Sequence, residues 1–143
     1  MWRSGISRRR QRTALMAMVQ AAVDSGMAEA PWRADPDVLH FYEDEGAILC
    51  ELQREWRTAL AGAVYVAIET GDGDLARDVR EAYAKVARRM SGVRQVLEAN
   101  ADHPSIAAAM RKERSLLAGF IDSSGWSPAG AVAGAGAGAT QAA

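Results

Sequence analysis

Cysteine occurs once in this sequence of 143 residues, at Cys50. A single cysteine excludes an intrachain disulfide and a cysteine-based metal site. Only two histidines are present and no Glu-x-x-His motif occurs, whereas di-iron helical bundles take such motifs from two helices. We therefore expect no metal and no other cofactor. Because nothing in the neighbouring sequence would activate its thiol, we expect Cys50 to be a small, partly buried hydrophobic residue.

Long apolar runs are also missing. None approaches the roughly 18 residues of a membrane-spanning helix, so we expect no membrane span and a cytoplasmic protein. Arg8–Arg10, the apolar stretch Ala14–Val23 and the triplet Ala28–Ala30 loosely copy the three parts of a secretory signal. Gln20 interrupts that stretch and Gly26 predicts a helix end, so export is the less favoured interpretation.

Neither sign of charge dominates, because the formal net charge is −1. This total points to neither a nucleic acid nor a basic partner. The distribution is less even. Residues 1–20 carry five arginines and no acid, residues 21–84 carry fourteen acids against five arginines, and residues 85–114 carry seven basic residues against three acids. Such asymmetry indicates that the ends and the middle of the chain meet different surroundings.

Much of the 49% hydrophobic fraction is alanine, which is the strongest helix former. Apolar residues recur at helical spacing, and we find no strand signal and no internal repeat. We predict an all-α protein, an antiparallel bundle of about four helices that pack in the manner of a coiled coil. The expected helices cover residues 7–25, 36–70, 75–99 and 104–122.

Local signals mark the ends of these helices. Asp35–Pro36 predicts an N-cap followed by proline at the first helical position. Gly46, just after three acidic residues, is the expected position of a kink or break in the second helix. Gly71–Asp74 predicts a tight turn, with Asp72 or Asp74 as the cap of the third helix. A short connection between two long helices makes them antiparallel, so we expect a long αα-hairpin.

Three segments follow from these patterns: a flexible basic arm at 1–12, a bundle domain at 13–122 and a disordered tail at 123–143. Arg8 and Arg12 fall on the apolar side of the first helix, and unpaired charges are not buried. The packed part of that helix is therefore expected to begin near Thr13. The tail is rich in alanine and glycine and has little bulk to pack, which is typical of disorder.

The candidate binding residues lie near the two ends of the chain. Arg8, Arg9, Arg10 and Arg12 are candidate contacts to nucleic acid phosphates, and the alternative is a solvated helix start that binds nothing. Trp32 and Trp126 lie outside the helical stripes, where a tryptophan either folds back onto the bundle or anchors a partner. We identify no convergent set of titratable groups and expect no catalytic residue.

These features favour a non-enzymatic interaction module, a small adaptor or scaffold that acts through helix–helix contacts with an unidentified protein partner. The long hairpin exceeds what two shorter helices cover, so an apolar stripe remains and predicts a homodimer or larger assembly. The alternative is a regulatory nucleic-acid-binding protein that uses the arginine arm, with the bundle as its dimerisation unit. A metal-binding or enzymatic bundle ranks third.

Overall fold

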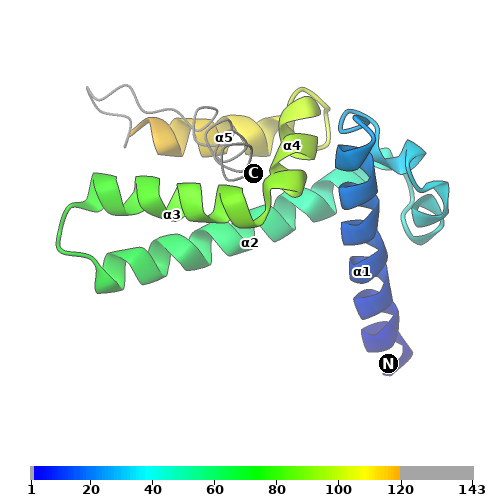
Figure 1. Ribbon diagram of the computed structural model, residues 1–143, viewed down its shortest axis with the longest axis horizontal. Helices are drawn as coiled ribbons and strands as arrows, with labels where there is room; N and C mark the ends of the chain where they lie inside the picture. The colour runs from blue at the N-terminus through cyan, green and yellow to red at the C-terminus, as the bar shows by residue number, and fades with distance from the viewer. Residues whose placement is uncertain (1, 120–143) are drawn as a thin grey trace, which may run out of the picture.

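The computed structural model describes residues 2–119, with the side chains of residues 8–119. Over this range the protein is all-α, as predicted, and contains no strand (Figure 1). The elements in chain order are α1 (Trp2–Asp24), η1 (Pro31–Arg33), η2 (Pro36–Phe41), α2 (Glu45–Thr70), α3 (Leu75–Arg89), α4 (Ser91–Ala99) and α5 (Ala107–Ala118), where η marks a 3-10 helix. The predicted tail at 123–143 lies outside the described residues.

The predicted αα-hairpin is formed by α2 and α3, which lie antiparallel (Figure 1). α2 ends at Thr70 with Gly71 as its C-cap, as the sequence indicated. The carboxylate of Asp74 caps α3 by accepting the backbone N–H of Arg77 at 3.1 Å. With 26 residues, α2 is about 39 Å long at 1.5 Å per residue, and it is the longest helix in the described part of the chain.

The prediction of one helix over 36–70 was wrong. Residues 36–41 form the 3-10 helix η2, and α2 begins only at Glu45. The side chain of Asp44 accepts the N–H of Ala47 at 2.8 Å and so acts as the real N-cap. Asp35 makes no capping hydrogen bond from its side chain. The helical path is interrupted at Asp44, two residues before Gly46. There the Asp44 side chain accepts the N–H of Ala47, which a continuous helix would bond to a backbone carbonyl.

The prediction of one helix over 75–99 was also wrong, because the helix turns at Met90 into α4. The turn carries α4 out of line with α3 and against α1 (Figure 1). Gly92 lies in this contact, where an added Cβ would be 3.1 Å from Cγ1 of Val19. The close approach to α1 therefore depends on a residue without a side chain.

α1 begins at Trp2, five residues before its expected start, and ends before Gly26, whose φ of +70° is typical of a helix-terminating glycine. Its C-terminal half packs against α4, η1 and η2, while its N-terminal half projects from the body (Figure 1). Among the α1 side chains that the structure describes, Leu15 is the first that is fully buried. The expected start of packing near Thr13 agrees with this arrangement.

The core lies where the N-terminal half of α2 meets α1, α3, α4 and the start of α5. We call this end of the hairpin proximal and the end at its turn distal. Its fully buried large side chains are Leu15, Met18, Val38, Ile48, Leu49, Leu52, Trp56, Tyr83, Val86, Val96, Leu97 and Ile106. All of the α2 residues in this set precede position 57. The C-terminal half of α2 therefore adds no fully buried large side chain to the core, and Ala59, Leu60, Ala63 and Val64 are only partly buried against it.

α5 runs beside α2 in the same direction, toward the turn of the hairpin (Figure 1). The carbonyl of Ser105 accepts the Sγ–H of Cys50, and Glu113 accepts the indole N–H of Trp56. Residue numbers therefore increase in the same direction along α2 and along the segment that contains α5. α5 begins at Ala107, three residues after the predicted start, and its described part ends at Ala118. Only Met110 and Leu117 are buried within this helix, which leaves α5 weakly covered.

Candidate functional site

An apolar groove lies along the distal half of the hairpin, bounded by α2, the start of α3 and the C-terminal half of α5. We call it the distal groove, and it has a volume of about 670 Å³. It is lined by Gln53, Arg57, Leu60, Ala61, Val64, Tyr65, Ile68, Leu75, Val79, Ala109, Lys112, Glu113, Leu116 and Leu117. Its charged lining residues Arg57, Lys112 and Glu113 come from the proximal end, so the far end is purely apolar.

Large apolar side chains on the rim of the distal groove face solvent. Tyr65 is 67% exposed, Leu116 63%, and Ile68 and Leu75 are each 48% exposed. These are four of the six large hydrophobic residues that are exposed in the described part of the chain. Single exposed apolar residues are ordinary, but a group that lines one groove is typical of a binding surface.

A buried charged network closes the proximal end of the groove. Arg94 is 4% exposed and donates from Nη1 to Oε2 of Glu113 at 2.8 Å and from Nη2 to Glu98. The indole N–H of Trp56 donates to the other oxygen of Glu113 at 2.5 Å. Glu113 therefore links α5 to both α2 and α4.

Two aromatic rings enclose the guanidinium of Arg94. Its Cζ lies 4.8 Å from the Trp56 ring centre and 5.7 Å from that of Tyr83. The two rings meet edge to face, 5.6 Å apart and inclined by 73°. Within the described residues, the Nε of Arg94 has no hydrogen-bond partner. The π faces therefore supply part of the stabilisation that a buried cation needs.

Burial shifts the pKa values in this network. It raises the pKa of Tyr83 far above the ordinary tyrosine value, against an opposing effect of the Arg94 charge. Burial lowers the pKa of Arg94, but the charges of Glu113, Tyr83 and Glu98 raise it, and the net result lies above the ordinary value. Near pH 7 Arg94 is thus a cation and Tyr83 is neutral, and the network joins α2, α4 and α5 through a buried ion pair.

Sequence reasoning missed this network. A signal was present, because Arg94 shares the helical stripe of Met90 and Leu97, and Glu98 follows it at the spacing of an intrahelical ion pair. The contribution of Glu113 comes from another helix. No local pattern could have indicated that pairing.

The structure places the four candidate arginines in two different settings. Arg8, Arg9 and Arg10 are exposed and belong to the half of α1 that projects from the body (Figure 1). Arg12 binds Glu55 on α2 through Nε–Oε1 at 3.1 Å and Nη2–Oε2 at 3.2 Å, and the hydrogen bond to Glu55 raises the pKa of Arg12. The prediction that all four project beyond the bundle was therefore wrong for Arg12, which packing brings to a carboxylate.

The two candidate tryptophan anchors differ as well. Trp32 folds back into the core, where it is 9% exposed. Trp126 lies outside the described residues. The prediction that Cys50 is partly buried was wrong, because the residue is exposed and its thiol donates to the Ser105 carbonyl at 3.4 Å.

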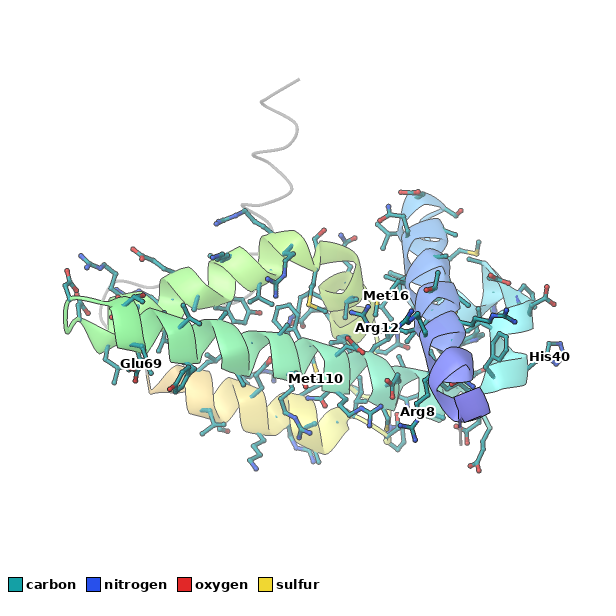
Figure 2. The ribbon with its side chains drawn as sticks, turned by 90° about the horizontal axis from the view of Figure 1, so that it is seen from below. Arg8, Arg12, Met16, His40, Glu69 and Met110 are labelled. Atoms are coloured by element: carbon teal, nitrogen blue, oxygen red, sulfur yellow. The ribbon has the colours of Figure 1, made fainter. Side chains whose placement is uncertain are left out.

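Cys50 lines a surface pocket of about 860 Å³ with His103 and acidic residues that precede α2. His103 accepts the backbone N–H of Ser105 through Nδ1 at 3.2 Å, and the Ser105 hydroxyl lies 2.8 Å from the same nitrogen. These bonds order the turn before α5. His40, the other histidine, lies at the end of the molecule and points away from the body (Figure 2). Among the described residues, no three His, Cys, Asp or Glu side chains form a group able to hold a metal ion.

No helix in the described range has the length and apolar character needed to cross a membrane. Comparison with protein-family models, with curated proteins and with solved structures found no match. The distal groove and the exposed arginines of α1 are therefore interpreted from their own geometry.

Proposed function

We propose that this protein is a non-enzymatic interaction module that self-associates through the distal groove. The observation that carries this proposal is the solvent exposure of Tyr65, Ile68, Leu75 and Leu116 around one apolar depression. Complete burial of one such side chain contributes about 1.5–3 kcal/mol. A helix laid into the groove would bury all four, which is the usual mode of helix recognition by a hydrophobic groove.

The charges near the two ends of the groove favour a second copy of the chain as its occupant. Arg57 and Lys112 line its proximal end, and Glu69 follows Ile68 at the distal end of α2 (Figure 2). In a two-fold arrangement the proximal end of one copy meets the distal end of the other. Glu69 of each copy then faces Arg57 and Lys112 of the other, which favours the antiparallel dimer over a parallel one.

The oligomeric state over a concentration series tests this proposal, by light scattering or sedimentation. We expect Ile68→Glu to weaken the dimer at least about tenfold, because a carboxylate replaces an apolar rim residue. The matched control is Val66→Glu, because Val66 is 57% exposed on the same helix but does not line the groove. A chain that stays monomeric at its highest soluble concentration, or a dimer equally insensitive to both variants, overturns the proposal.

A second function, nucleic acid binding, is favoured by the exposure of Arg8, Arg9 and Arg10 on the projecting end of α1. A cationic helix of this kind can follow a phosphate backbone. Because Arg12 is held by Glu55, we expect three phosphate contacts and a log–log salt slope near −2.7 on duplex DNA.

Binding of duplex DNA and of single-stranded RNA across a salt series tests this second function. Replacement of Arg8, Arg9 and Arg10 by alanine should abolish binding. Arg111→Ala, on an exposed arginine of α5, is the control and should leave most of the affinity. Absence of binding at low salt removes this function.

A further inference from the structure

We propose that residues 120–126 of the same chain occupy the distal groove and compete there with the second copy. The groove thereby becomes a regulated surface. The competition with a second copy rests on the proposed function, whereas the contact within one chain does not. Three observations support the proposal: the direction of α5, the residues that follow it and the length of the uncovered surface.

The C-terminal end of α5 lies at the groove. Its last turn supplies Leu116 and Leu117 to the lining, and it runs toward the turn of the hairpin (Figure 1). Beyond Leu117 the groove continues over Tyr65, Ile68 and Leu75, which α5 does not reach. Whatever follows Gly119 therefore starts beside the exposed apolar rim.

The sequence after Gly119 has the right side chains for this rim. Phe120 and Ile121 follow Leu116 and Leu117 by four residues each, which is the spacing of one helical face. Trp126 comes five residues after Ile121. From Ser127 onward the sequence has no aromatic residue and Val132 as its only branched aliphatic residue. The large hydrophobic side chains after Gly119 are therefore concentrated in residues 120–126.

The length of the segment matches the uncovered surface. Ala61 and Ile68, which both line the groove, are seven residues apart on α2, or about 10 Å at 1.5 Å per residue. Seven residues span about 10 Å as a helix and up to about 23 Å when extended. Residues 120–126 are therefore long enough to cover the rim in either conformation, and they carry a charge only at Asp122.

Two truncations separate the covering segment from the rest of the sequence. One removes residues 120–143 and the other removes only residues 129–143. A full-length variant with Phe120→Ser, Ile121→Ser and Trp126→Ser keeps the chain length, and far-ultraviolet circular dichroism confirms that each variant is folded. Fluorescence of an apolar dye is measured at a concentration where all variants are monomeric, and dimerisation is measured in a separate concentration series.

We expect the truncation at 120 and the triple serine variant to raise dye fluorescence and to tighten the dimer about tenfold. The truncation at 129 should match the full chain in both measurements. Equal dye fluorescence in all four proteins overturns the inference, and a dimer that remains sensitive to Ile68→Glu leaves the proposed function standing. Raised fluorescence without a dimer at any concentration supports the contact within one chain and overturns self-association.

Discussion

The guanidinium of Arg94 lies over the indole ring of Trp56, and both side chains donate to the carboxylate of Glu113. This relationship joins α4, α2 and α5 at a single buried point. It also sets the proximal boundary of the distal groove, because Glu113 is one of its lining residues. Glu113 therefore helps to fix the position of α5, and with it the shape of the groove.

We expect Glu113→Ala to lower the free energy of unfolding by about 3 kcal/mol, because it leaves Arg94 and the Trp56 N–H without their shared acceptor in a buried site. Urea denaturation measures this change. Glu113→Gln should lose less, since an amide oxygen still accepts one hydrogen bond. Equal, small losses in both variants would show that the network contributes little.

We expect stability to fall as the pH rises above about 10, the ordinary tyrosine pKa, because burial raises the pKa of Tyr83 in the folded state. The unfolded chain then releases a proton that the folded chain retains, which favours unfolding. Tyr83→Phe should flatten this decline, measured as the denaturation midpoint against pH. Tyr65→Phe, on an exposed ring, should leave it in place. A decline of the same slope in Tyr83→Phe contradicts the prediction.

Gly71 and Gly62 form a matched pair for substitution by alanine. A Cβ at Gly71 would lie 2.1 Å from Oδ2 of Asp78 and 2.7 Å from the carbonyl oxygen of Ala67, whereas nothing lies within 4 Å of one at Gly62. Gly71→Ala should therefore destabilise by about 1–3 kcal/mol. Gly62→Ala, inside a helix, should stabilise by up to about 1 kcal/mol. The shift of the thermal unfolding midpoint measures both changes in stability. Shifts in the same direction for the two variants would contradict the prediction.

Asp35, the predicted N-cap, and Asp44, the observed one, give a further test of where α2 begins. Asp44→Ala should lower the stability by about 1 kcal/mol, because the Asp44 side chain accepts the N–H of Ala47. Asp35→Ala should change it much less, since the Asp35 side chain makes no capping bond. Chemical denaturation of the two variants checks this order. The reverse order would mean that capping at Asp35 stabilises the fold after all.

Sequence reasoning predicted the helical class, the hairpin and the helix ends at Gly26 and Gly71, because these depend on neighbours a few residues apart. It left the cap of α3 open between Asp72 and Asp74, and the structure shows Asp74. It also predicted an apolar stripe on the uncovered hairpin. The break before Glu45 was placed wrongly, although Asp44 and Ala47 are close in sequence. The prediction took Asp35 as the cap, but Asp44 is the same residue type, and residue type alone does not show which of the two caps the helix.

Other features depended on packing between distant segments. The turn at Met90 brings α4 against α1, and the buried charge of Arg94 is tolerated because Glu113 arrives from another helix. Arg12 meets Glu55 across 43 residues of sequence, and the rim of the distal groove is assembled from three helices. Periodicity shows that a helix has an apolar face. Which part of that face stays uncovered follows only from the arrangement of all the helices, because burial is a property of the whole chain.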